Sequence, residues 1–123
     1  MKHLILGAIA LSCVCLVAIS ARASFNEDHK MTGVLIDNAC GADKADEAAA
    51  AKHSVKCCLK DSCAASGFQL IVGDKHYKLD TAGNVQAVAY LKTAKSTRAT
   101  IGCTVDGDVI KVIAITAVAD AAK

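Results

Sequence analysis

Four residues in the first half of the chain have types and spacing that favour metal ligation: Cys40, His53, Cys57 and Cys63. His53 and Cys57 are four positions apart, so on a helix they would share one face at a separation that a metal ion bridges. Three thiolates and one imidazole suit tetrahedral Zn²⁺, or copper where soft ligands dominate. The spacing matches no known zinc ribbon or knuckle, because Cys-x-x-Cys is absent from the sequence.

The cysteines have a second interpretation as disulfide partners. A bridge from Cys40 to Cys57 or Cys63 would pin the intervening segment to the preceding strand, and by loop-closure entropy it would be worth about 3 kcal/mol. Cys58 is the fourth disulfide candidate, and Cys103 lies much later in the chain. Their odd number leaves at least one thiol outside any intramolecular bridge. We favour the disulfide interpretation over the metal, because the chain is predicted to be exported to an oxidising compartment.

The predicted export depends on the first residues of the chain. A short basic start is followed by an almost uninterrupted apolar run over 4–19, and small residues occupy the two positions that a signal peptidase inspects, the second being Ala23. The run falls short of the ~20 residues that span a bilayer. We therefore expect cleavage after Ala23, which removes 1–23 and leaves 24–123 as one domain. Retention as a membrane anchor and lipid modification of Cys13 are the alternatives.

The sequence contains no convincing catalytic constellation. Gly-x-Ser-x-Gly, a phosphate-binding glycine loop and His-Glu-x-x-His are all absent. A nucleophile pair of Cys57 with His53 could be drawn, but no third residue that would orient the histidine is identifiable. We therefore expect a protein that is not an enzyme, with thiol–disulfide exchange as the enzymatic alternative.

Composition bears on both the partner class and the stability of the domain. Loss of Lys2 and Arg22 with the leader reduces the 14 basic residues to 12, which equals the 12 acidic ones. This balance gives no electrostatic reason to bind nucleic acid or anionic lipid. Aromatic side chains make up only 3% of the chain, so the core must consist of smaller aliphatic residues. Such a core gains much from a covalent or metal crosslink.

Five strands and several helical segments are expected to position the cysteines. β-rich or alternating segments bounded by turn formers predict strands over 31–37, 68–72, 76–79, 97–105 and 109–118. Helix propensity and capping residues predict helices over 43–51, 54–66 and 85–93, with Asp43 and Asn84 as N-caps and Gly67 as a left-handed stop. The alternation of the fourth strand places Cys103 on the inward side, with Ile101 and Val105.

The order of these elements predicts a fold. Five strands with a helix between the third and fourth form the element order of the oligonucleotide/oligosaccharide-binding (OB) barrel, here with a helical insertion after the first strand. We therefore expect a mostly β, α+β domain, with a two-layer α+β sheet as the alternative. OB-type binding of single strands uses aromatic platforms and a basic groove, and the chain has few of either.

From Met31 onward the chain resembles a group of small exported bacterial proteins that have an OB-like domain and no settled function. The resemblance covers almost all of the mature chain. It is carried first by Asp-x-x-Cys from Asp37 and by His-x3-Cys-x5-Cys-x2-Ser-Gly from His53. A Gly-Asp-Lys hairpin from Gly73 then leads to Tyr-Lys-Leu-Asp from Tyr77. Gly-Asn from Gly83 and a closing Asp-Gly-Asp hairpin from Asp106 complete the pattern. The resemblance implies an OB-like fold and an extracytoplasmic setting, and it brings no known activity. Cys58 and Cys103 are additions to the pattern.

Together these features predict a periplasmic or secreted binding or envelope-associated module. It would be stapled by one or more disulfides among Cys40, Cys57, Cys58 and Cys63, with no cofactor. Its partner would be an unidentified small ligand or envelope protein, and no nucleic acid is expected. The first alternative is a Zn- or Cu-binding protein that uses Cys40, His53, Cys57 and Cys63, and the second is a thiol–disulfide enzyme.

Overall fold

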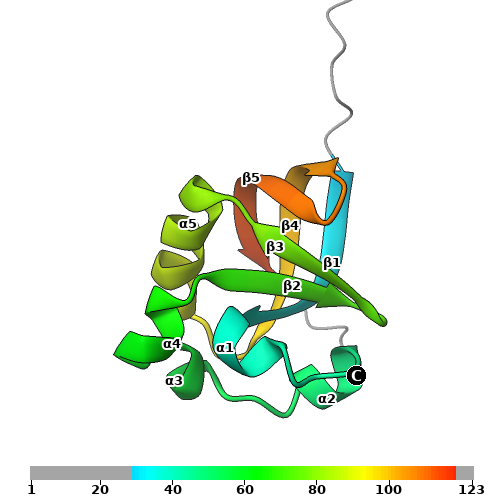
Figure 1. Cartoon of the computed structure of the whole chain (residues 1–123). Helices are drawn as coiled ribbons and strands as arrows, with labels where there is room; N and C mark the ends of the chain where they lie inside the picture. Colours follow the sequence, from blue (N-terminus) through cyan, green and yellow to red (C-terminus); the bar gives the residue numbers. More distant parts are fainter. Residues whose placement is uncertain (1–28, 119–123) are drawn as a thin grey trace, which may run out of the picture.

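Five strands close into a barrel in the computed structural model, which describes residues 29–118 (Figure 1). The strands are β1 (His29–Asp37), β2 (Phe68–Val72), β3 (Lys75–Leu79), β4 (Arg98–Asp106) and β5 (Val109–Ala117). Their order around the barrel is β1-β2-β3-β5-β4, and β1 pairs with β4 to close it. The β3–β5 pair is parallel and the other pairs are antiparallel. A closed, mixed, five-stranded α+β barrel is consistent with the expected OB-like barrel and excludes the open two-layer sheet.

The barrel closes around β1, which changes partner along its length. Its first part pairs with β4 and its last part with β2, and Val34 is paired on both sides. The preceding residue, Gly33, must lack a side chain, because a Cβ added there would clash with the carbonyl oxygen of Ile71. From Val34 to Asp37 the strand is buried throughout, so the end of β1 lies deep in the domain. The predicted signal peptide and its cleavage site lie outside the described residues.

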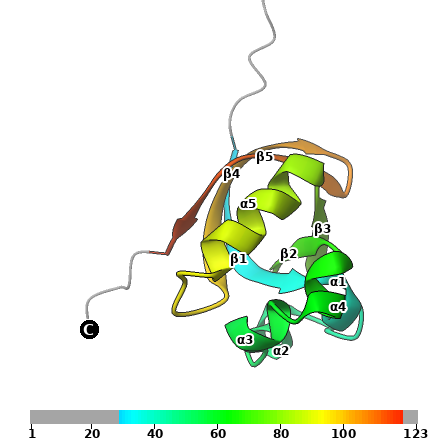
Figure 2. The same cartoon turned by 90° about the vertical axis from the view of Figure 1, so that its left-hand side faces the viewer.

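Four short helices connect β1 to β2 and gather at the end of the barrel where β1 finishes (Figures 1 and 2). They are α1 (Asn38–Gly41), α2 (Glu47–Ala50), α3 (Val55–Cys58) and α4 (Asp61–Ala65). The predicted helices over 43–51 and 54–66 are therefore wrong in their bounds: the first is reduced to α2, and the second is divided into α3 and α4. Side-chain caps set the starts of α2 and α3: Asp46, and not Asp43, accepts the Ala49 N–H at 2.8 Å, and Ser54 accepts the Cys57 N–H at 3.1 Å. Helix α4 begins after Lys60 without a side-chain cap.

Helix α5 (Thr81–Leu91) lies between β3 and β4 in sequence and packs against β5 (Figure 2). Its N-cap is Asp80, whose Oδ1 accepts the Gly83 N–H at 2.9 Å, so the prediction that Asn84 caps the helix is wrong. Asn84 lies inside α5 and its Oδ1 accepts the backbone N–H of Phe68 at 2.8 Å. The amide is therefore used to hold the start of β2 against the helix. Helix α5 buries Ala87 and Leu91 and leaves Val85 and Ala89 exposed.

Small aliphatic side chains fill the barrel, as the composition predicts. Phe68 is the largest fully buried side chain, and Cys103 is fully buried beside Ile101. Val105 was expected to share their side, but it is 42% exposed because it lies near the tip of the β4–β5 hairpin. Gly67 ends the region after α4 in the left-handed conformation, with φ of 82°, as expected. Within residues 29–118 no helix is both long and apolar enough to cross a membrane.

Candidate metal centre

Asp37 lies at the centre of a cluster of thiols and one imidazole. It is the last residue of β1 and the N-cap of α1, and its Oδ2 accepts the backbone N–H of Cys40 at 2.9 Å. Its side chain is fully buried. A buried carboxylate with one capping bond is incompletely compensated, so its second oxygen requires a partner.

The second oxygen of Asp37 faces His53. The distance between His53 Nε2 and Asp37 Oδ1 is 3.3 Å, and the two side chains are 14% and 0% exposed. Despite this short distance the atoms are not aligned as a hydrogen bond, and among the described residues neither has any other hydrogen-bond partner. The buried Cys58 thiol completes a trio with them, in which the ligand atoms all lie within 4.8 Å of one another. We call Asp37, His53 and Cys58 the first trio.

A second trio shares the same carboxylate. Asp37, Cys40 and Cys63 also bring their ligand atoms within 4.8 Å of one another. Cys40 comes from α1 and Cys63 from α4, and both are half-buried. The cluster is thus formed by the end of β1 and by helices on the single segment that joins β1 to β2.

The electrostatics of the cluster disfavour free thiolates. Burial and then the Asp37 carboxylate raise the pKa of Cys40 to about 11. Burial is also the main reason that the pKa of Cys58 rises to about 12, with the charge of Asp37 adding to it and a backbone hydrogen bond opposing it. Without a cation these thiols stay protonated at neutral pH. A bound divalent ion reverses this balance, because a coordinated thiol is deprotonated outright.

The structure brings three of the four predicted ligands to the carboxylate, namely Cys40, His53 and Cys63. Cys57 belongs to neither trio. The i, i+4 argument fails because α3 begins after the Ser54 cap, so His53 precedes the helix that carries Cys57. In its place Cys58, the next residue along α3, is buried and joins the first trio. All the cysteines of the described residues are free thiols in the structure.

Sequence reasoning missed the residue on which both trios depend, Asp37. The only signal was its place in Asp-x-x-Cys at the end of a strand, which is also the position of a helix N-cap. A cap normally faces solvent. Here the helices that follow fold back over it, which only the tertiary structure reveals.

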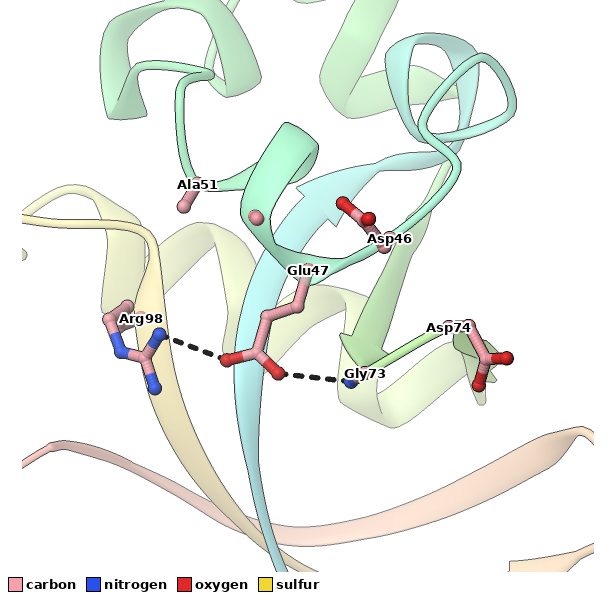
Figure 3. A pocket seen from close by; sticks show the side chains of 7 residues that line it. Asp46, Glu47, Ala51, Gly73, Asp74 and Arg98 are labelled. Carbon is pink, nitrogen blue, oxygen red and sulfur yellow. Dashed lines mark hydrogen bonds and ion pairs between the residues drawn. The ribbon is translucent and has the colours of Figure 1, made fainter.

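A separate surface pocket of about 480 Å³ lies between α2, the β2–β3 turn and β4 (Figure 3). Its centre is Glu47, whose carboxylate pairs with Arg98 at 2.9 Å and accepts the Gly73 N–H at 3.0 Å. These groups satisfy one another and tie α2 to the barrel. The pocket therefore has a structural explanation that the cluster at Asp37 lacks.

Comparison with known proteins adds no functional assignment. The chain has no significant similarity to a protein-family model, to a curated protein or to a solved structure. The functional argument therefore depends on the geometry of the site.

Proposed function

We propose that this protein is an exported, non-enzymatic, OB-like module that binds one Zn²⁺ ion at the Asp37-centred cluster. The observation that carries the proposal is the unaligned contact between His53 Nε2 and Asp37 Oδ1, two buried polar atoms 3.3 Å apart with no other partner in the described part of the chain. Two ligands at ~2.0–2.1 Å from a tetrahedral zinc ion are about 3.3 Å apart, so this is the separation of two atoms that share a metal.

The chemistry of the donor set favours zinc over copper(I). A carboxylate is a hard ligand and an imidazole is intermediate, whereas copper(I) prefers thiolates and thioethers. Zn²⁺ accepts carboxylate, imidazole and thiolate together, at 2.0–2.3 Å. Asp37, His53 and Cys58 supply one of each.

An ion pair between a protonated His53 and Asp37 is a weaker explanation of the contact. A charged pair of this kind gains its stability from an N–H directed at the oxygen, and this alignment is missing here. A thiol–disulfide enzyme is also less well supported. Its attacking cysteine must be a thiolate, and the raised pKa of Cys40 opposes that form.

Metal analysis of the exported protein tests the proposal. The precursor is expressed with its leader, purified from the periplasm without chelator, and its zinc content is measured by mass spectrometry. We expect one zinc per chain in the wild type and a loss of at least ~100-fold in zinc affinity in His53→Ala, because a ligand is removed. His76→Ala is the matched control, since that imidazole contacts Gln69 at 2.8 Å and belongs to neither trio.

Two results would overturn the proposal. One is wild-type protein that takes up no zinc on dialysis against the metal. The other is a His53→Ala variant that binds zinc as tightly as the His76→Ala control.

A further inference from the structure

Cys40 and Cys63, the two cysteines of the second trio, are half-buried and lie close to each other, whereas Cys58 is fully buried. This difference suits the pair to disulfide formation and Cys58 to metal ligation. We propose that Cys40 and Cys63 close into a disulfide in the exported protein, which leaves Asp37, His53 and Cys58 as the three protein ligands of an open metal site. The disulfide part stands on its own geometry, and the part concerning the metal rests on the proposed function.

The thiols of Cys40 and Cys63 already lie near each other. Their sulfurs are within 4.8 Å, and a disulfide requires about 2.05 Å. The gap of under about 3 Å is on the scale by which rotation about the Cα–Cβ bonds moves two sulfurs. Both side chains are half-buried, so a small oxidant can reach them.

Hydrogen bonds hold the two segments together without help from the sulfurs. Asn38 donates from its side chain to the Ser66 carbonyl at 2.9 Å and from its backbone to the Gly67 carbonyl at 2.9 Å. The Ala39 N–H donates to the Ser66 hydroxyl at 3.1 Å. These bonds join the residues just before Cys40 to the residues that follow Cys63. The thiols are therefore positioned before they react, which removes much of the entropy cost of joining them.

The remaining cysteines are poorly placed to compete. Cys103 is fully buried in the barrel on β4, and Cys58 is fully buried against Asp37 and His53. Cys57 is half-buried on α3, but its thiol joins neither trio. The alternative bridge from Cys40 to Cys57, which the sequence left open, is not supported by any such group of neighbouring ligand atoms among the described residues.

The oxidation balances with a disulfide of low molecular weight as oxidant, such as oxidised glutathione. The Cys63 thiolate attacks the oxidant and releases one reduced thiol, and Cys40 then displaces the other half from the mixed disulfide and gives its proton to the departing thiolate. A sulfur–sulfur bond forms in the protein and one breaks in the oxidant. The two protons of the protein thiols leave with the two released thiols, and no other reactant is required.

Disulfide formation changes what the cluster offers to a metal. The sulfurs of a disulfide carry no charge and are no longer thiolate ligands. Asp37 loses two potential anionic neighbours and keeps His53 and Cys58. A zinc ion with three protein ligands has an open fourth position for water or an exchangeable ligand, whereas four protein ligands would close the site.

Peptide mapping of the periplasmic protein, alkylated before denaturation, tests the pairing. Trypsin separates the cysteines into peptides 31–44, 57–60, 61–75 and 99–111, which carry Cys40, Cys57 with Cys58, Cys63 and Cys103. We expect peptide 31–44 to be linked to peptide 61–75. In the other two peptides, Cys57 is alkylated in the native protein, and the buried Cys58 and Cys103 are alkylated only after unfolding. Cys57→Ser is the matched control and keeps the link, and Cys63→Ser loses it.

Zinc titration of the oxidised and the reduced wild type tests the coupling. We expect one zinc per chain in both states, at least 10-fold weaker retention against a chelator in the oxidised state, and no such difference in Cys63→Ser. A linked pair that involves peptide 57–60, or fully alkylated 31–44 and 61–75 in the native protein, would overturn the pairing. Zinc binding would still stand in that case. A mapped Cys40–Cys63 link without any zinc would instead remove the proposed function and leave the disulfide.

Discussion

At the scale of single residues, Asp37 uses its two carboxylate oxygens in two different ways. One carboxylate oxygen caps α1 and the other faces His53 with no aligned donor. Burial of a charge with only partial compensation is costly unless a counter-charge is present. A metal cation is the counter-charge that the surrounding thiols and imidazole are suited to hold.

The buried thiol of Cys103 predicts a dependence of stability on alkaline pH. Burial raises the pKa of Cys103 above its ordinary value of 9.0. A raised pKa in the folded state means that the stabilisation is fully present below the unfolded value and is lost as the pH rises through the folded value. We expect the urea midpoint of the reduced, metal-free protein to fall as the pH rises above 9.0, the ordinary value of the thiol.

The Cys103→Ala variant isolates this contribution. Cys103 lies outside both trios, so the change leaves the cluster intact. The variant is expected to lose less stability than the wild type between pH 8 and pH 11, whatever its stability at pH 8. Parallel pH profiles for the two proteins would show that the Cys103 thiol does not contribute.

At the scale of elements, side-chain caps decided where α2 and α5 begin, and the sequence contained two candidates for each cap. Asp43 and Asp46 both precede the alanine-rich stretch, and Asp80 and Asn84 both precede the later apolar segment. The caps used are Asp46 and Asp80. The choice depends on contacts distant in sequence, since Asp80 Oδ1 also accepts the Val112 N–H at 3.2 Å.

The amide of Asn84 gives a prediction at this scale. It satisfies the backbone N–H of Phe68, the first residue of β2, and its loss leaves a partly buried donor without a partner. Asn84→Ala is therefore expected to lower the free energy of unfolding by about 1–3 kcal/mol, measured by urea denaturation. Gln86→Ala in the same helix is the control, because within residues 29–118 its side chain makes one hydrogen bond, to the Val112 carbonyl, and this bond is 3.5 Å long. Equal effects in the two variants would contradict the role assigned to Asn84.

At the scale of the whole molecule, the fold places the cluster where the proposed metal ion would crosslink the short helices between β1 and β2. The helices between β1 and β2 are each four or five residues long, too short to be stable alone. The three ligands are Asp37 at the end of β1, His53 between α2 and α3, and Cys58 on α3. A metal bound to them would attach this segment to the barrel. A bound ion therefore acts on the stability of the entire domain.

Removal of the metal is expected to lower the melting temperature. With free zinc at 100 times its dissociation constant, binding adds about 2.7 kcal/mol to the free energy of unfolding. For a domain of this size that corresponds to roughly 10–20 °C. Calorimetry of zinc-loaded and chelator-treated protein measures the difference, which should vanish in His53→Ala and persist in His76→Ala. An equal melting temperature with and without zinc would contradict a coupling of the ion to folding.

The sequence alone determined the strands and the broad class of the fold. Alternation and turn residues locate all the strands to within two residues at each end, because the local rules of strand formation act on neighbouring positions. Residue type and spacing also identified Cys40, His53 and Cys63 as candidate metal ligands. The signal peptide and the export of the chain stay predictions from the sequence.

Only the tertiary structure decided which side chains meet. It replaced Cys57 with Cys58 and added Asp37, because the direction of each side chain depends on where α3 begins and on how the short helices fold back over the end of β1. Spacing along a chain fixes a distance only while one regular element continues. Between His53 and Cys57 the element is interrupted at Ser54, and from there packing, not periodicity, sets the geometry of the site.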